Sequence, residues 1–91
     1  MEFIIIDGRR MTSVEETHLY LMRTLRLPDY YGKNLDALYD CLGDLGRGVW
    51  IILINGDMMD EALGDYAGKL REVFRQATNR AYACKFTEYR S

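Results

Sequence analysis

Cysteine and histidine are scarce in this sequence of 91 residues. Its two cysteines are Cys41 and Cys84, and its one histidine is His18. No CxxC pair is present, so the chain lacks the ligands for a structural zinc site. Two cysteines are also too few for a disulfide framework, and we expect two reduced, mostly buried thiols. The sequence therefore predicts neither a metal centre nor a bound cofactor.

Long apolar runs are missing as well. The opening MEFIII has no basic segment, and its apolar run is too short for a signal peptide. No run approaches the roughly 20 apolar residues of a membrane span. We therefore expect a soluble, cytoplasmic protein without membrane contact. A chain of 91 residues, 48% of them hydrophobic, is expected to form one domain spanning residues 1–91.

Motifs of catalysis are absent too. The DGRR and NGD segments lack the glycine patterns of phosphate-binding loops, and His18 has no serine or cysteine nucleophile near it. Asp36 and Asp40 lie one helical turn apart, which gives two ligands where a hard cation takes about six. A convex helix also offers no dry cleft. The sequence thus predicts a protein that is not an enzyme.

Three segments predict the strands. Residues 2–6 and 49–54 are continuous apolar runs typical of buried strands, and residues 81–87 alternate between apolar and polar side chains. A glycine-containing turn is expected at residues 46–48. Strands separated by helices favour parallel pairing with right-handed crossovers. We therefore predict an α/β fold, with a three-stranded parallel sheet flanked by about four helices.

The helices are predicted from their caps and apolar spacing. Ser13 and Glu16 have capping-box spacing at the start of a helix that ends near Leu25, and Asn34 can cap a second helix to about residue 42. The expected core positions of the first helix are Val14, Leu21, Met22 and Leu25. Further helices are predicted at residues 57–63 and 66–79, the last with core positions Leu70, Val73, Phe74 and Ala77.

Charge is concentrated in one segment. The chain has a formal charge of −2, but residues 29–44 alone hold four acids and one base, which leaves the remainder at +1. A local acidic patch on a nearly neutral body suggests a basic partner. The same patch argues against contact with a phosphate backbone.

The second helix has two distinct faces. At 100° per residue, Leu35, Leu38 and Leu42 share one face, whereas Asp36, Tyr39, Asp40 and Gly43 fall on another. Acids four residues apart repel mildly, so pairing within the helix does not explain them. Tyrosine is enriched at protein interfaces, and Tyr30 and Tyr31 precede this helix as expected exposed aromatics. An ordinary solvated helix face remains the alternative explanation.

A family resemblance centres on the same helix. The segment LPDYYGKNLDALYDCL, residues 27–42, resembles the hallmark segment of the barstar family, intracellular inhibitors of secreted bacterial ribonucleases. Weaker similarity runs along nearly the whole chain, including Asp7-Gly8 after the first strand, His18, and VFR at residues 73–75. The resemblance implies the family fold, and a role in binding a ribonuclease and blocking its active site.

The resemblance also implies the partner-binding residues, which are Tyr30, Asn34, Asp36, Tyr39, Asp40, Gly43 and Gln76. Asp40 would be the central anchor at the enzyme's phosphate site, supported by Asp36. The sequence departs from the family where Tyr39 replaces a tryptophan and where Lys33 and Gln76 replace acids. The implied partner is a basic protein, an extracellular-type ribonuclease or nuclease toxin, and the free chain is expected to be a monomer.

Two other functions compete with this interpretation. Arg71, Arg75 and Arg80 would make the polar side of the last helix basic, which suits a nucleic-acid-binding domain. The sequence pI of about 5.3 argues against nucleic acid as a partner. The other alternative is an interaction protein of the same fold with an unrelated partner.

Overall fold

The computed structural model describes residues 2–45, 48–80 and 84–89. Part of the turn predicted at residues 46–48, and the start of the predicted third strand at residues 81–83, lie outside the described residues. The strands are β1 (Glu2–Asp7), β2 (Val49–Ile54) and β3 (Cys84–Glu88). The helices are α1 (Val14–Thr24), α2 (Leu35–Gly43), α3 (Gly56–Leu63) and α4 (Asp65–Arg80), with a 3-10 turn η1 (Gly8–Arg10) after β1.

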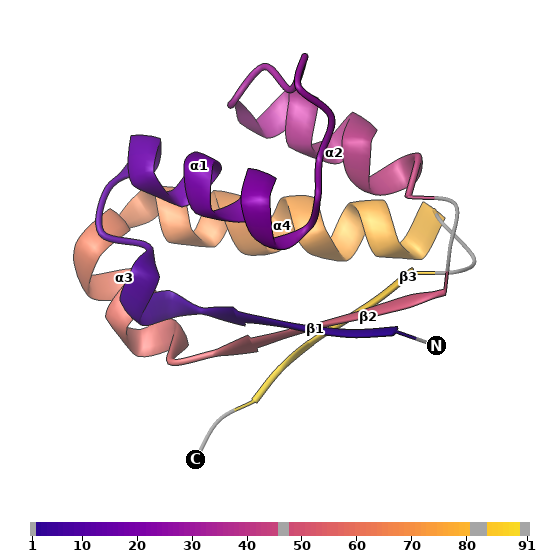
Figure 1. The fold of residues 1–91 in the computed structure, drawn as a ribbon. Coiled ribbons are helices and arrows are strands. Elements are labelled where there is room, and N and C mark those ends of the chain that lie inside the picture. The colour runs from indigo at the N-terminus through magenta and orange to yellow at the C-terminus, as the bar shows by residue number, and fades with distance from the viewer. Residues whose placement is uncertain (1, 46–47, 81–83, 90–91) are drawn as a thin grey trace.

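The strands form one sheet in the order β1-β2-β3, and both strand pairs are parallel. Helices α1, α2 and α4 lie on one side of this sheet, and α3 sits beyond the ends of β1 and β2 (Figure 1). Helix α4 contacts both β3 and α2, so it separates α2 from the strands. The predicted α/β fold is confirmed, and its layering leaves α2 at the edge of the molecule.

The prediction of fully buried strands is wrong for β1. Its side chains alternate, with Ile4 and Ile6 in the core but Phe3 62% and Ile5 56% exposed. Strand β2 alternates too, and its buried positions are Val49, Ile51 and Leu53. The reason is that the helices cover one face of the sheet, so every second side chain points away from them.

The core lies between the covered sheet face and the helices. Leu70, Phe74 and Ala77 of α4 are buried there, as the apolar spacing of this helix predicts. Phe74 stacks on Phe86 of β3, with ring centroids 4.9 Å apart. Together these contacts fix α4 on the sheet and make it the platform for α2.

Helix α1 begins and ends where its sequence signals predict. The Ser13 hydroxyl accepts a hydrogen bond from the Glu16 backbone N–H at 3.1 Å, and Leu21 and Leu25 are fully buried. Val14 was expected in the same apolar stripe, but its side chain is 41% exposed. As the first residue of the helix it lies at the solvated end of the stripe.

The turn after β1 is held by Asp7 and Gly8. The Asp7 carboxylate accepts hydrogen bonds from the Arg9 backbone N–H and from Asn55 Nδ2, at 2.9 and 3.0 Å. Hydrogen bonding to Arg9 is the main cause that lowers the pKa of Asp7 to about 2. A Cβ on Gly8 would lie 2.1 Å from the Asn55 carbonyl oxygen, so only glycine allows this close approach.

Candidate partner-binding site

The start of α2 is fixed by Asn34. Its Oδ1 accepts a hydrogen bond from the Ala37 backbone N–H at 2.8 Å, as the sequence predicts, and its Nδ2 donates to the Gly32 carbonyl at 3.2 Å. Lys33 has a φ of 56°, in the left-handed region, which turns the chain sharply into the helix. Both ends of the Asn34 amide are therefore used to hold the entry to α2 in one conformation.

The two faces of α2 separate as predicted. Leu38 and Leu42 are fully buried, whereas Asp36 and Asp40 are exposed. Tyr39 and Gly43 are half-buried at the boundary between the faces. The leucines anchor the helix on α4, so the carboxylates of Asp36 and Asp40 are presented to solvent from a fixed backbone.

A third acid extends this exposed row. Asp44 follows the helix and is exposed, four residues beyond Asp40, and we call Asp36, Asp40 and Asp44 the acidic stripe. Successive members are separated by about 6 Å along the axis of an ideal helix. Among the described residues, none of the three makes a side-chain hydrogen bond or ion pair. Asp44 was not among the expected site residues, although its spacing of four from Asp40 in the sequence was a signal for it.

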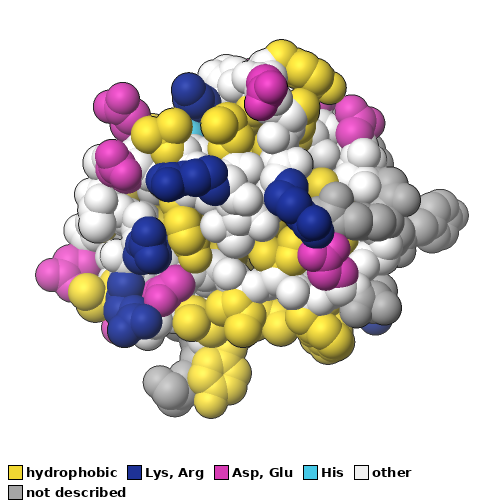
Figure 2. All heavy atoms as spheres, in the orientation of Figure 1, with side chains coloured by type: hydrophobic (Ala, Val, Ile, Leu, Met, Phe, Trp, Pro, Cys, Tyr) yellow, Lys and Arg dark blue, Asp and Glu magenta, His cyan; other side chains and the backbone are white. Residues whose placement is uncertain are grey.

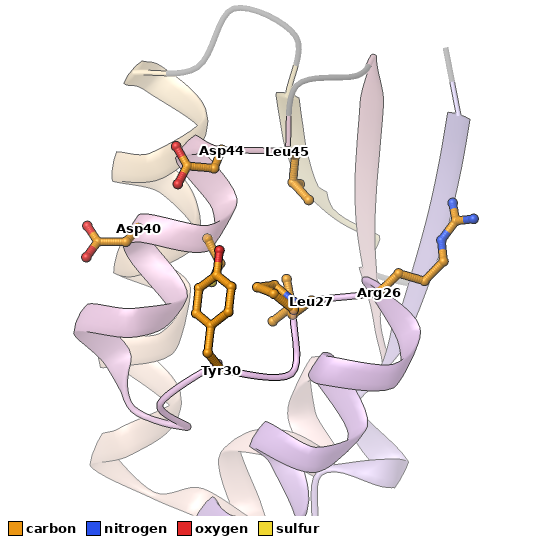
Figure 3. Close-up of a pocket in the computed structure, with 8 residues that line it drawn as sticks. Arg26, Leu27, Tyr30, Asp40, Asp44 and Leu45 are labelled. Atoms are coloured by element: carbon orange, nitrogen blue, oxygen red, sulfur yellow. The ribbon is translucent and has the colours of Figure 1, made fainter.

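A hollow of about 230 Å³ opens beside the stripe. It is lined by Arg26, Leu27, Pro28, Tyr30, Asp40, Cys41, Asp44 and Leu45. Figure 3 shows the Tyr30 ring standing beside α2, and the Asp40 and Asp44 carboxylates projecting from the helix to the left, away from the ring. The Tyr30 side chain is 86% exposed, so one wall of the hollow is an aromatic ring open to solvent. The site can thus offer negative charge, aromatic surface and an apolar floor to a partner.

Tyr31 has the opposite environment to Tyr30, so the expectation of two exposed tyrosines is wrong for Tyr31. Its side chain is 4% exposed, and its hydroxyl lies 2.5 Å from Nδ1 of His18, while the Tyr66 hydroxyl lies 2.7 Å from Nε2. Burial lowers the pKa of His18 and raises that of Tyr31. The contacts among Tyr31, His18 and the half-buried Tyr66 tie the loop before α2 to α1 and α4, and so hold Tyr30 at the surface.

Gln76 lies apart from the hollow. It is exposed on α4, and its Nε2 donates a hydrogen bond to Glu72 Oε1 at 3.1 Å. The resemblance placed Gln76 on the partner-binding surface, and it occupies the helix on which α2 packs. A direct role in binding stays a prediction for Gln76 and equally for the other expected site residues, Tyr30, Asn34, Asp36, Tyr39, Asp40 and Gly43.

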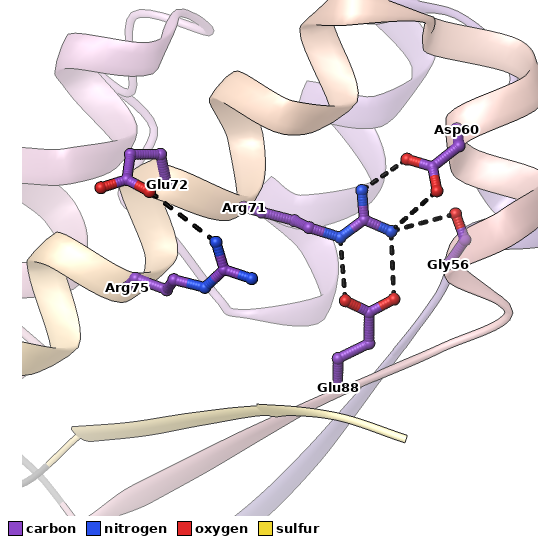
Figure 4. Close-up of polar contacts among 6 residues, drawn as sticks. All are labelled: Gly56, Asp60, Arg71, Glu72, Arg75 and Glu88. Atoms are coloured by element: carbon purple, nitrogen blue, oxygen red, sulfur yellow. Dashed lines mark hydrogen bonds and ion pairs between the residues drawn. The ribbon is translucent and has the colours of Figure 1, made fainter. Parts of the chain in front are cut away.

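The predicted basic face of α4 is wrong at Arg71. This side chain is buried, and its guanidinium bonds Glu88 Oε1 and Oε2 at 2.8 and 3.0 Å, both carboxylate oxygens of Asp60, and the Gly56 carbonyl (Figure 4). We call Gly56, Asp60, Arg71 and Glu88 the Arg71 cluster. Arg75 lies 3.7 Å from Glu72, and the Arg80 side chain lies outside the described residues.

The described part of the chain lacks the features of a metal site or a membrane span. No group of three or more His, Cys, Asp or Glu side chains there could hold a metal ion. Within residues 2–45, 48–80 and 84–89, no helix is long and apolar enough to cross a membrane. Cys41 is half-buried and Cys84 is buried, and the two are free cysteines. Burial raises the pKa of both thiols.

Known proteins resemble this chain over most of its length. The family model described as barstar (barnase inhibitor) matches residues 1–89. A curated relative, named "Putative ribonuclease inhibitor YrdF", comes from Bacillus subtilis (strain 168). It is 44% identical over 78 residues, which cover 85% of this chain and 86% of the relative.

Proposed function

The chain belongs to the barstar family, and on that premise we propose that it inhibits a ribonuclease by filling the enzyme's active site with α2 and the loop before it. The observation that carries this proposal is the acidic stripe, three exposed carboxylates on and directly after a helix whose start and base are both fixed, with no ion pair to any described residue. The name of the Bacillus relative agrees with this role.

The chemistry of ribonucleases explains why an acidic helix suits this task. An enzyme that cleaves RNA binds phosphates in a basic cleft, and carboxylates offered at the same place compete for the same cations. The acidic stripe also attracts a basic protein at a distance, which favours fast association. Because Asn34 and the buried Tyr31 already hold the helix and its loop, little conformational freedom is lost on binding.

Individual side chains take different roles in this proposal. Asp40, between its two acidic neighbours and at the rim of the hollow, is the central anchor for the enzyme's cations. Asp36 and Asp44 extend the negative surface on either side. Tyr30 offers an exposed ring on which a flat cationic or aromatic group of the enzyme can stack. Tyr39 and Gly43 complete the contact surface at the edge of the helix.

The partner in this proposal is a basic ribonuclease of the extracellular type, held inactive inside the cell that makes it. The inhibitor itself would be cytoplasmic and would act by binding alone, without catalysis. Lys33 and Gln76 stand where the family has acids, and they reduce the negative charge around the acidic stripe. The affinity for the ribonuclease therefore depends more heavily on the acidic stripe itself. The nucleic-acid alternative is weakened because the Arg71 guanidinium is occupied by carboxylates and a carbonyl. No observation specifically favours an unrelated protein partner.

Inhibition of RNA cleavage is the direct test. Purified chain is titrated into a barnase-type ribonuclease and into other basic ribonucleases, with a fluorogenic RNA as substrate. We expect stoichiometric loss of cleavage with at least one enzyme, and a one-to-one complex by size-exclusion chromatography. Asp57→Ala is the matched control for Asp40→Ala, since Asp57 is an exposed acid on α3. Absence of both inhibition and complex across the enzymes would refute the proposal.

A further inference from the structure

The face of the sheet that the helices leave open carries a continuous set of large apolar side chains. We call it the outer sheet face, and its members are Phe3, Ile5, Trp50, Ile52, Ile54 and Tyr89. The strand register aligns Phe3 with Trp50 and Ile5 with Ile52, so these side chains form adjacent rows. In Figure 2 hydrophobic side chains line the lower margin of the molecule, where Figure 1 shows the sheet.

A parallel sheet with one bare apolar face is unusual. All-parallel sheets occur almost only where both faces are covered, and monomeric proteins seldom expose contiguous apolar patches of more than a few hundred Å². We propose that a second copy of this chain covers the outer sheet face, and that the protein forms a two-fold dimer by packing the two sheets face to face. Sheets packed in this way lie about 10 Å apart.

The area of the face agrees with a weak dimer. Phe3 is 62% and Tyr89 63% exposed, and an aromatic side chain has roughly 150–250 Å² to bury, so these two offer on the order of 250 Å². With Ile5 and the half-buried side chains of β2, each copy offers about 450 Å² of apolar surface. The dimer would bury roughly 900 Å² in total, which is more than most crystal contacts but less than a standard interface.

Charge favours a second copy over a charged partner. On the same side of the sheet, the described charged residues beside the outer sheet face are Lys85, whose Nζ lies 5.6 Å from the Trp50 ring centroid, and Asp7, which is paired with Arg9. A two-fold axis along β2 lays β3 of one copy over β1 of the other. Lys85 then faces Phe3 of the second copy, because the register puts both in one row, and the two lysines stay apart.

The dimer leaves the acidic stripe open. Helix α2 lies on the far side of α4 from the sheet, so a second copy on the outer sheet face does not reach it (Figure 1). Two copies would therefore present two acidic stripes in opposite directions. The expected free monomer becomes one state of a monomer–dimer equilibrium, and the ribonuclease-binding role is unaffected by it.

Self-association is measured by sedimentation equilibrium from roughly 1 µM to roughly 1 mM, because an interface this small should bind more weakly than about 1 µM. We expect the mass to rise from the monomer's 10.6 kDa towards twice that value. Trp50, the one tryptophan of the chain, reports on the face itself, and its fluorescence should shift to the blue as the dimer forms. A monomer mass at every concentration, or growth beyond the dimer, overturns the proposal.

Two exposed apolar residues on different surfaces provide matched variants. Ile5→Glu places a carboxylate in the outer sheet face, whereas Val14→Glu places one at the start of α1. We expect Ile5→Glu to weaken dimerisation at least tenfold and Val14→Glu to leave it unchanged, with circular dichroism confirming that both fold. Tyr89→Ser gives a second variant of the face beyond the end of β3. Dimerisation that survives both Ile5→Glu and Tyr89→Ser would place the contact elsewhere and overturn the proposal.

Discussion

The acidic stripe and the Arg71 cluster contain the same kind of side chain in opposite settings. Around Arg71, the carboxylates of Asp60 and Glu88 are engaged by one guanidinium, and the Arg71 and Glu88 side chains are 10% and 12% exposed. On α2, Asp36 and Asp40 are exposed and have no partner among the described residues. The first set joins α3, α4 and β3, whereas the second forms no link between the described elements.

This difference separates charges that hold the fold from charges that await a partner. A buried charge without a counter-charge is expensive, so the Arg71 cluster is complete in the free protein. An exposed acid can remain unpaired at little expense and pair later with a basic protein. Substitutions in the two regions should therefore affect different properties, namely stability in one and affinity in the other.

The largest effect is expected from Arg71→Met, which would remove the guanidinium that bonds the carboxylates of Glu88 and Asp60. We expect the free energy of unfolding to fall by about 3 kcal/mol, measured by urea denaturation followed by circular dichroism. Arg75→Met is the matched control, because Arg75 is exposed and lies 3.7 Å from Glu72. It should cost no more than about 0.5 kcal/mol. Equal effects of the two variants would mean that the Arg71 cluster behaves as ordinary surface.

Asp40→Ala should produce the reverse pattern. If Asp40 lies at the desolvated centre of the complex, its loss should weaken ribonuclease binding by at least about 2 kcal/mol, or roughly 30-fold. The free energy of unfolding should change by no more than about 0.5 kcal/mol, because the side chain is exposed and makes no hydrogen bond or ion pair among the described residues. Calorimetric titration against the inhibited enzyme measures the first quantity and urea denaturation the second.

The Asp57→Ala variant calibrates this result. Asp57 is exposed in the first turn of α3, away from the acidic stripe, so its removal should leave affinity nearly unchanged. The free energy of unfolding is harder to interpret for this control than the affinity, because an acid in the first turn also interacts with the helix dipole. Wild-type affinity in the Asp40→Ala variant would mean that the acidic stripe is solvated surface without a role in binding.

Local signals in the sequence were sufficient to predict where α2 begins and which of its faces is buried. Asn34 sets the cap, and the spacing of Leu38 and Leu42 sets the buried face, so the exposure of Asp36 and Asp40 follows from periodicity alone. The parallel sheet followed from apolar segments separated by helices, and the family resemblance added which residues of the exposed face to single out.

Contacts between residues far apart in the sequence could not be predicted from such local signals. From its position along α4, Arg71 is expected at the surface. It is buried because Glu88 of β3, 17 residues later in the sequence, packs beside it and accepts its hydrogen bonds. Tyr31 is adjacent to the exposed Tyr30 in the loop before α2, and it packs inside the protein against His18 of α1. The bare face of β1 depends on which side of the sheet the helices occupy, and an apolar run does not encode that choice.

His18 gives a pH-dependent test of the loop that supports the acidic stripe. Burial lowers the pKa of His18 below its ordinary value of 6.5, so the folded state favours the neutral ring. Stability is then complete above about pH 6.5 and falls as the pH drops below it, by at most about 1.4 kcal/mol per pH unit for one proton. Urea denaturation between about pH 7 and 5.5, above the range where most carboxylates titrate, measures this slope.

The His18→Gln variant shows whether that slope belongs to His18. Glutamine can still hydrogen-bond a tyrosine hydroxyl but does not titrate, so its stability should be lower at pH 7 and flatter with pH. An unchanged slope would assign the acid sensitivity to other groups. The hydroxyls of Tyr31 and Tyr66 stay neutral throughout this range, because burial raises the pKa of each.

The smallest expected effect tests whether repulsion within the acidic stripe lowers the stability of the fold. Asp40→Asn preserves shape but removes the charge between Asp36 and Asp44, each four residues away. Like charges at this spacing destabilise a helix by roughly 0.2–0.5 kcal/mol per pair, and an acid near the C-terminal end also opposes the helix dipole. We expect the free energy of unfolding to rise by about 0.5 kcal/mol at low salt, and the gain to shrink near 1 M salt, where the screening length is about 3 Å. The same variant should bind the ribonuclease more weakly than the wild type. A variant that is less stable at low salt would show that the Asp40 charge supports the fold, and the contrast with the Arg71 cluster would no longer hold.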